Sequence, residues 1–390
     1  MSNNVIRKAI QKVATGPEFS KNISEEESYH TMMDILDNES DSIQAAIYLI
    51  AMRMKRETME ENIGSLKALI DRSNIITANV DELLDIAEPY NGFLRNTPLS
   101  AFLPAVFSAI GIPCLTHGVN TVGPKFGLTA KKILKASGVN VNNDLQAASD
   151  FLSNENIGWT YIDQEKFCKP LYDLIDLRTR MVKRTILTTI EVLVGPIRAK
   201  NKTHLLTGYV HAAYPPVYSD LAKVAGFDTA VLVKGVEGGV SPALRGDGKV
   251  FYYSNNQEMK EIKFNPKNIS IEQNMRAVPL PDLEKIEDIK LDEISSDINI
   301  DDFSIKAAEI GSDALNGKDG PAKDTLIYTG ALTLSIIKNI EFNVAADQLK
   351  KAINSGKAKE FFYNAKWFII NLQTNLNSYL GLKEKNERNI

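Results

Sequence analysis

A glycine-rich loop followed by a helix is the feature of this sequence whose residue types could do chemistry. The loop spans His117–Gly127 and contains three glycines and one lysine, and a helix is predicted over Thr129–Ala136. Backbone N–H groups of a glycine loop at a helix N-terminus can hold an anion such as a phosphate. The same pattern is also typical of an ordinary strand-to-helix connection, so the residues alone leave both interpretations open.

The elements around this loop indicate an α/β arrangement. A helix is predicted after Thr97, which can cap it, and Gly111 ends it. The apolar segment Ile112–Leu115 then predicts a short buried strand that leads into the loop. Further along, the strand predicted over Thr229–Val233 ends in a second glycine-rich turn, Lys234–Gly239.

The composition is ordinary for a soluble globular protein, with 44% hydrophobic residues, 24% charged residues and a formal net charge of −4. This charge argues against a chain that binds polyanions with its whole surface. No apolar run approaches the roughly 18 residues of a membrane span, and the N-terminus has no signal-type apolar core. The two cysteines, Cys114 and Cys168, indicate a reducing compartment. We therefore expect a cytoplasmic protein without a membrane partner.

Helices dominate the N-terminal part of the sequence. Ser24 and Glu27 form a capping box, and two further amphipathic helices are predicted over Ile43–Lys55 and Glu60–Arg72. Each helix needs a partner for its apolar face. We expect them to form a small helical domain over residues 1–82.

The remaining residues, 83–390, are expected to form a larger α/β domain. A hairpin is predicted over Lys249–Ser254 and Met259–Phe264. The segment Leu283–Asp302 is acidic and poor in large apolar residues, which favours a loop. A final amphipathic helix is predicted over Phe361–Leu380.

Five segments, in order along nearly the whole chain, resemble glycosyltransferase family 3, which includes the anthranilate phosphoribosyltransferases and the pyrimidine nucleoside phosphorylases. They are Ile23–Glu61, the loop THGVNTVGPKFG, Arg178–Thr185 with Val194–Pro196, Leu315–Leu334 and Ala352–Ala358. The resemblance implies a small N-terminal helical domain, joined by part of roughly 164–210, and an α/β domain with a central mixed, mostly parallel sheet flanked by helices. It also implies a homodimer joined through the helical domain, with the site in the cleft between the domains.

The resemblance implies a phosphate-binding donor loop, but this chain departs from its pattern. The family's active members carry GTGGD where this chain has Glu88–Phe93, with a single glycine. Pro89 has no N–H group, and Tyr90 is bulky where backbone must approach a phosphate. Six residues remain candidates for donor or phosphate contacts: Asn91, Gly92, His117, Gly118, Lys125 and Gly127. For His117 and Lys125, a structural hydrogen bond and a solvated loop position are the respective alternatives.

The metal and acceptor positions also differ from the family. Val240 and Ser241 stand where the family has an adjacent Asp-Glu pair. Glu237 is the only carboxylate close to these two positions in the sequence. One carboxylate holds Mg²⁺ only if substrate phosphates supply other ligands, so Glu237 is a weak metal candidate and Mg²⁺ is expected only with a bound phosphoribosyl donor. Arg178 and Arg184 lie on the family's arginine segment and are candidates for binding the acceptor or another anion.

Two function hypotheses follow. The first is a pentosyl or phosphoribosyl transferase by fold that is not an efficient anthranilate phosphoribosyltransferase, because the donor loop and the metal pair are missing. Its partner would be a small phosphorylated sugar, and no catalytic residue can be assigned. The alternative is a non-catalytic member that binds nucleic acid through the basic segment Arg178–Lys202. The two hypotheses differ on enzymatic activity, and the sequence does not decide between them.

Overall fold

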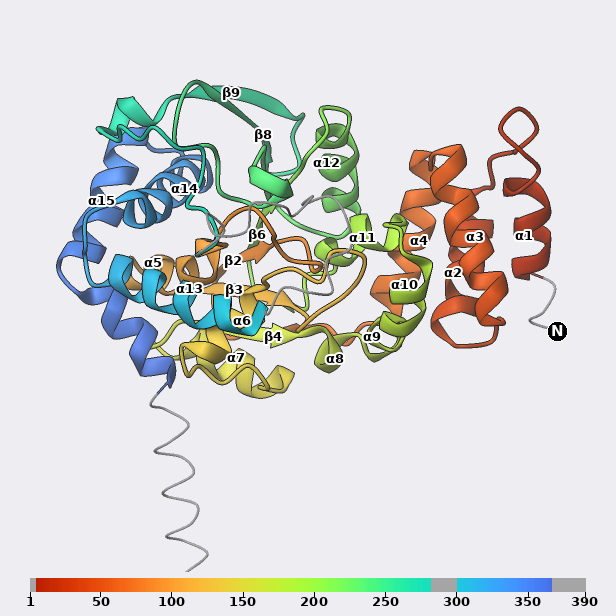
Figure 1. The fold of residues 1–390 in the computed structure, drawn as a ribbon, viewed down its shortest axis with the longest axis horizontal. Coiled ribbons are helices and arrows are strands. Elements are labelled where there is room, and N and C mark those ends of the chain that lie inside the picture. Colours follow the sequence, from red (N-terminus) through yellow and green to blue (C-terminus); the bar gives the residue numbers. More distant parts are fainter. Residues whose placement is uncertain (1–4, 282–299, 367–390) are drawn as a thin grey trace, which may run out of the picture.

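The structure, a computed structural model, describes residues 5–281 and 300–366. Figure 1 shows a group of helices at one side of the molecule and a larger part, built on a sheet, at the other. Within the described residues, no helix is both long enough and apolar enough to cross a membrane.

A seven-stranded sheet organises the larger part, with the strand order β4-β3-β2-β6-β7-β8-β9. The strands are β2 (Glu82–Ala87), β3 (Cys114–Gly118), β4 (Trp159–Asp163), β6 (Lys202–Gly208), β7 (Thr229–Val233), β8 (Gly248–Ser254) and β9 (Lys260–Phe264). The strands from β4 to β7 pair in parallel, and β8 and β9 continue the sheet in antiparallel fashion. The mixed, mostly parallel sheet and the β8–β9 hairpin are thus confirmed.

Helices cover both faces of this sheet, as expected where parallel strands are buried on both sides. One core lies under the C-terminal helices and includes Phe102, Trp159 and Tyr328. The other core continues toward the N-terminal helices and includes Tyr48 and Phe167. The covering elements are η2 (Leu99–Phe102), α5 (Leu103–Ala109), α6 (Ala130–Ala136), α7 (Leu145–Ser153), α12 (Tyr214–Val224), α13 (Ile300–Leu315), α14 (Pro321–Lys338) and α15 (Phe342–Asn354), with short helical turns η4 (Val236–Gly238) and η5 (Pro266–Ile269).

The N-terminal helices form a bundle at the side of the molecule. They are α1 (Val5–Val13), α2 (Glu25–Leu36), α3 (Ser42–Lys55) and α4 (Met59–Asp71). The predicted capping box of Ser24 and Glu27 begins α2, and Thr58 with Glu61 forms a second one at α4. A Cβ atom at Gly64 would lie 2.1 Å from the carbonyl oxygen of Glu25, so α2 and α4 approach too closely for a larger residue.

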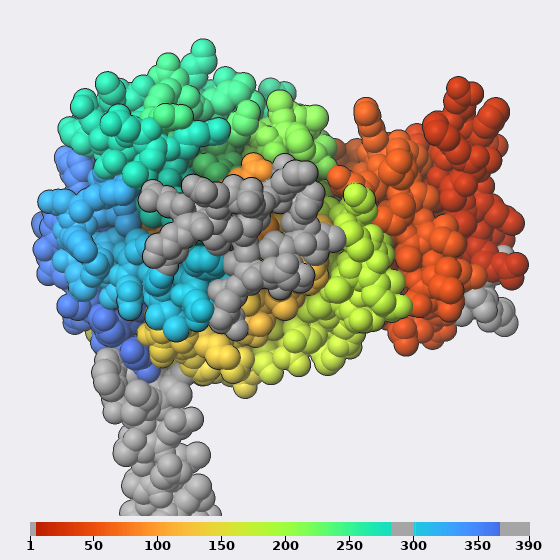
Figure 2. Space-filling view, viewed as in Figure 1, coloured from red at the N-terminus to blue at the C-terminus, as the bar shows by residue number. Residues whose placement is uncertain are grey.

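The middle of the chain joins the bundle to the sheet. The connecting elements are α8 (Gln164–Phe167), α9 (Lys169–Asp173), α10 (Ile175–Met181), α11 (Ile186–Ile190), η3 (Glu191–Leu193) and a small sheet of β1 (Ile76–Thr77) and β5 (Ile197–Arg198). Helices α10 and α11 contact α3, and α11 also contacts α4. In the space-filling view this yellow-green segment lies between the orange bundle and the rest of the molecule (Figure 2).

Some predicted boundaries are wrong. The strand predicted over Ile112–Leu115 is β3, Cys114–Gly118, so His117 and Gly118 belong to a strand and not to the loop. Residues 300–302 of the predicted acidic loop begin α13, and the rest of that segment lies outside the described residues. The predicted final helix is observed as far as residue 366, and its remainder also lies outside them.

Strand β6 is missing from the predicted elements because it carries polar residues on a buried strand. Its polar side chains are satisfied by neighbours that are far away in sequence. The hydroxyl of Thr207 donates to the carbonyl oxygen of Ala87 at 2.8 Å, and Nε2 of His204 lies 2.9 Å from Oε1 of Glu82. Lys338, at the end of α14, also pairs with the Glu82 carboxylate.

We expect this pairing to make stability depend on pH in the acid range. Hydrogen bonds from His204 and Lys338 lower the pKa of Glu82 from 4.5 to about 2. A depressed carboxylate pKa gives a stabilising contribution that is complete above about pH 4.5 and is lost as the pH falls toward about 2. The difference in free energy of unfolding between the wild type and Glu82→Gln, measured by urea unfolding, should therefore narrow between about pH 6 and pH 3. Glu261→Gln, in an exposed pair with Lys249, is the control. A Glu82→Gln difference that stays constant over this range would contradict the assignment.

Candidate functional site

The site lies where β2 and β3 end, because these parallel strands bring the two loops that follow them together. Ala87 at the end of β2 is in register with His117 of β3. Beyond the strands, the loops bond to each other: Phe93 N donates to Leu128 O at 3.0 Å, and Leu128 N donates back to Phe93 O at 2.8 Å. The donor loop and the glycine-rich loop thus form one backbone unit.

Gly92 and Gly127 make this close approach sterically feasible. A Cβ atom at Gly92 would lie 2.6 Å from the carbonyl carbon of Gly127, and one at Gly127 would lie 2.4 Å from the nitrogen of Phe93. Gly92 also has φ of +72°, which disfavours any other residue. Both predicted site glycines are therefore used for contact between the loops.

The carboxylate of Glu237, from the turn after β7, accepts hydrogen bonds from the backbone N–H groups of the two residues that follow the donor loop. Leu94 N donates to its two oxygens at 3.1 and 3.2 Å, and Arg95 N donates to Oε1. The Nζ of Lys125 pairs with Oε2 and also donates to the Gly92 carbonyl oxygen at 2.9 Å. Only 6% of the Glu237 side chain is exposed, so this carboxylate is an internal anion.

Burial changes the charge balance around Lys125. Loss of hydration lowers the pKa of this lysine, and the nearby Glu237 carboxylate acts in the opposite direction. The ring of Phe93 lies 5.5 Å from its Nζ. The structure thus brings Lys125 and Glu237 together as one buried ion pair.

Two further amides of the loops also have internal acceptors. Gly92 N donates to Pro89 O at 3.0 Å, and Gly127 N donates to Asn91 O at 2.9 Å. Together with the bonds made by Phe93, Leu94, Arg95 and Leu128, six amides that could line a phosphate cradle are engaged within the protein. Phosphate would have to displace these bonds in order to bind there.

A second carboxylate lies at the start of the donor loop. Glu88 is 8% exposed, and its two oxygens accept bonds from Ser100 Oγ at 2.5 Å and from Val240 N at 3.2 Å. Burial raises the pKa of this carboxyl group, while the two hydrogen bonds act against the rise. Glu88 thus ties the donor loop to the backbone of the position where the family has its metal-binding pair.

His117 points into the interior of the protein. Its Nδ1 is hydrogen-bonded to the hydroxyl of Tyr90, and its Nε2 lies 3.0 Å from Oδ1 of Asp85. The rings of Tyr90 and Phe167 make edge contacts with it. All of these side chains are buried, and Gly118 follows at the end of the strand. The bond between His117 of β3 and Tyr90 thus fixes the donor loop to the end of the sheet.

The structure separates the two predicted arginines. Arg178 is 4% exposed, and it makes two hydrogen bonds with the carboxylate of Glu191, at 2.6 and 2.8 Å. Arg184 lines a cavity of about 110 Å³ beside the donor loop. Among the described residues no hydrogen bond or ion pair reaches its guanidinium group. Arg184 is therefore the predicted arginine that faces open space.

This cavity also contains residues that sequence reasoning missed. Arg53, from the end of α3, and His211, from the turn after β6, line it together with Asn91 and Glu237. Arg53 lies more than a hundred residues before Arg184, and no local signal links the two. His211 follows a strand that the sequence did not reveal.

The residues present do not fit a divalent metal ion. Mg²⁺ prefers several oxygen ligands at octahedral positions. Among the described residues, no group of three or more His, Cys, Asp or Glu side chains could hold a metal. Glu237, the carboxylate predicted as a weak metal candidate, is already bonded to two amides and a lysine.

Comparisons with known proteins agree with this architecture. The family described as the glycosyl transferase family, helical bundle domain, matches residues 7–73. An anthranilate phosphoribosyltransferase from Acetivibrio thermocellus is 24% identical over 357 residues, or 91% of this chain and 94% of the relative. An uncharacterized protein from Aquifex aeolicus is 25% identical over 239 residues, or 61% of this chain and 71% of the relative. The solved structure of anthranilate phosphoribosyltransferase from Saccharomyces cerevisiae in complex with PRPP (phosphoribosyl pyrophosphate) and Mg has a TM-score of 0.71 at 16% identity, covering 92% of this chain and 97% of that chain.

The N-terminal helical bundle matches the helical bundle domain of the glycosyl transferase family, and the whole chain shares the fold of anthranilate phosphoribosyltransferase. More narrowly, the chain is similar in sequence to anthranilate phosphoribosyltransferases, and two relatives of that name each align with 91% of it at 24% identity.

The buried pair predicts a large loss of stability when one partner is removed. Glu237→Ala leaves two amides without an acceptor and Lys125 without its carboxylate partner, and breaking a buried ion pair in this way costs roughly 3–5 kcal/mol. The double variant Lys125→Ala/Glu237→Ala should lose less than the sum of the two single variants, as measured by urea unfolding.

The exposed pair of Asp176 and Arg180 provides the control, and Asp176→Ala should change stability little. Strictly additive effects of Lys125→Ala and Glu237→Ala would mean that the two residues do not interact.

Proposed function

We propose that this chain uses the anthranilate phosphoribosyltransferase fold to bind a small acidic molecule in the cleft beside the donor loop. We further propose that it does not transfer a phosphoribosyl group from phosphoribosyl pyrophosphate to anthranilate. The observation that carries the proposal is the position of Glu237, whose carboxylate accepts bonds from the two amides that follow the donor loop and that could otherwise face a phosphate. If the protein is an enzyme, we propose that it is a pentosyl transferase whose substrates are not phosphoribosyl pyrophosphate and anthranilate.

The contrast with a structural neighbour supports this proposal. The yeast enzyme of the same fold was solved in complex with PRPP and Mg. In this chain, two carboxylates, Glu88 and Glu237, are bonded into the loops where a negatively charged donor would have to lie. Like charges at short range repel strongly in a site with little water.

We expect no pyrophosphate release when the protein is incubated with phosphoribosyl pyrophosphate, anthranilate and Mg²⁺. A coupled pyrophosphate assay should read the same with the protein as without it, while a yeast anthranilate phosphoribosyltransferase run in parallel gives a signal. Release of pyrophosphate in step with consumption of anthranilate would overturn the proposal.

The nucleic-acid alternative receives less support from the placement of the basic segment. Arg178 is buried against Glu191, and Arg198 donates to the carbonyl oxygens of Val194 and Ala225 inside the protein. Arg180 is paired with Asp176. These three arginines bond to the protein itself, so they do not form one continuous basic surface for nucleic acid. We therefore prefer the small-molecule proposal.

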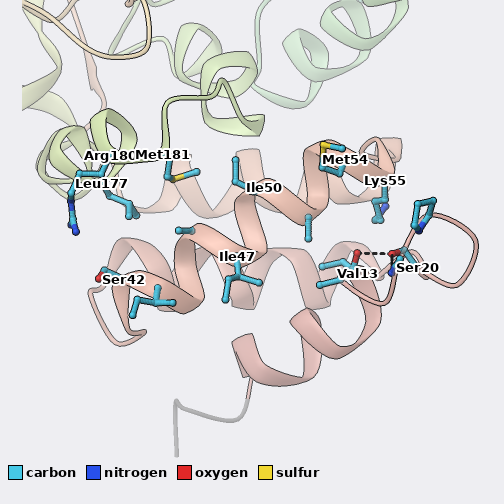
Figure 3. A pocket seen from close by; sticks show the side chains of 16 residues that line it. Val13, Ser20, Ser42, Ile47, Ile50, Met54, Lys55, Leu177, Arg180 and Met181 are labelled. Carbon is cyan, nitrogen blue, oxygen red and sulfur yellow. Dashed lines mark hydrogen bonds between the residues drawn. The ribbon is translucent and has the colours of Figure 1, made fainter. Parts of the chain in front are cut away.

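We also propose that two copies of the chain associate through the helical bundle. An apolar groove of about 670 Å³ runs along α3, with Leu177 and Met181 of α10 on its other side (Figure 3). Ile43, Ile47 and Met54 on α3 expose 68%, 45% and 77% of their surface. A second copy of the same groove would cover these side chains in a symmetric dimer.

Ile47→Glu should convert a dimer into a monomer, because it places a charge in the apolar groove. Light scattering after gel filtration should report twice 43.2 kDa for the wild type and 43.2 kDa for the variant. Val344→Glu, at an exposed apolar position of α15, is the control and should leave the dimer intact. A wild-type protein that elutes as a monomer would refute the dimer.

The proposal keeps the domain division and the location expected from the sequence. We propose that residues 1–82 belong to the helical domain, joined by part of roughly 164–210, and that residues 83–390 belong to the α/β domain. The contacts of α10 with α3, and of α11 with α3 and α4, support this division. A cytoplasmic location is supported by Cys114 and Cys168, which are both free and buried.

A further inference from the structure

The cavity beside the donor loop has a cationic lining that narrows the class of acidic molecule that it could bind. It is formed where the end of α3, the segment before α11 and the turn after β6 meet Pro89 and Asn91. Arg53 and Arg184 contribute two guanidinium groups from different parts of the fold. A ligand here would touch both the helical bundle and the sheet domain.

Neither of these arginines is neutralised by a direct partner. Among the described residues, no hydrogen bond or ion pair reaches Arg53 or Arg184, whereas Arg178 and Arg72 each bind a carboxylate. Burial lowers the pKa of Arg184, and the neighbouring charge of Arg53 lowers it further. Two like charges that face one cavity without a directly bonded carboxylate form an electrostatic site for an anion.

The one carboxylate in the lining is already committed elsewhere. Glu237 is bonded to the amides of Leu94 and Arg95 and to Lys125, which balances its charge, although the carboxylate still opposes the lowering of the Arg184 pKa. The other titratable groups of the lining are His211, Tyr209, Tyr214 and Tyr218. The two arginines therefore leave the cavity with an unbalanced positive charge.

The lining also contains polar side chains that can donate hydrogen bonds to a ligand. Asn91 is 2% exposed, and neither Oδ1 nor Nδ2 of its side chain has a hydrogen-bond partner among the described residues. A buried amide without a partner is costly and calls for an explanation such as a bound ligand. The side-chain hydroxyls of Thr188 and Thr189, on α11, also line the cavity.

We propose that this cavity binds a phosphate dianion, either free or at the end of a small phosphate ester, through Arg53, Arg184 and Asn91 and without a metal ion. The inference rests on the proposed function only in placing the ligand in the same cleft. It concerns a different part of that cleft from the donor-loop amides.

The chemistry of the lining favours phosphate over a carboxylate. A phosphate has three or four oxygens that accept hydrogen bonds from several directions, and arginine forks bind such oxygens in pairs. A carboxylate offers two oxygens in one plane and a single charge, which would leave one guanidinium unbalanced. The volume of about 110 Å³ suits a compact group of this kind.

Isothermal titration of the full chain in EDTA tests the proposal, with inorganic phosphate, ribose 5-phosphate and benzoate as probes. We expect both phosphate compounds to bind and benzoate to bind more weakly. Equal affinity for the two phosphates would identify the free ion as the ligand. Tenfold or tighter binding of ribose 5-phosphate would identify an ester.

Arg184→Gln and Arg53→Gln should each weaken phosphate binding at least tenfold. Arg53 is exposed, so its variant keeps the test valid if Arg184→Gln folds poorly. Arg7→Gln, an exposed arginine on α1 of the same bundle, is the matched control and should bind as the wild type does.

Three outcomes would overturn the phosphate site: no phosphate binding in EDTA, tighter binding of benzoate than of phosphate, or unchanged affinity in both arginine variants. Failure of the proposed function is a separate result, because it would appear as pyrophosphate release with Mg²⁺ and anthranilate. Neither result determines the other.

Discussion

The bond between the Glu237 carboxylate and the donor-loop amides is the constraint on which the rest of the site depends. This side chain comes from the turn after β7 and reaches Leu94 N, Arg95 N and Lys125. A buried carboxylate without such partners would be strongly unfavourable, so the loops and the turn must be held in one arrangement. The same bonds fill the space in which backbone N–H groups could otherwise receive a phosphate.

Internal carboxylates satisfy donors and cations throughout this region. Glu88 bonds to Val240 N and Ser100, and Glu191 neutralises Arg178 in the middle segment. In each case a group that could have faced a ligand faces the protein instead. Arg53 and Arg184 are the contrast, because both line a cavity without a direct partner among the described residues. The positive charge that a ligand can reach therefore lies at the junction with the helical bundle and not in the loops.

The sequence predicted the fold well and the site less well. Local signals such as the capping box at Ser24 and the apolar run of β7 depend on near neighbours, so they could be read directly. Strand β6 could not, because His204 and Thr207 are satisfied by β2, which lies about 120 residues earlier in the chain. The partners of Glu237 and the approach of Arg53 to Arg184 are likewise long-range contacts. Residue types were enough to predict which residues could belong to a site, but only the fold shows which of these residues contact one another.

A crystal structure of the protein soaked with phosphoribosyl pyrophosphate and Mg²⁺ tests the central claim most directly. The result we predict is electron density that keeps the Glu237 carboxylate on the amides of Leu94 and Arg95, with no diphosphate in the donor loop. A diphosphate bound to those amides, with Glu237 displaced toward a magnesium ion, would contradict the account.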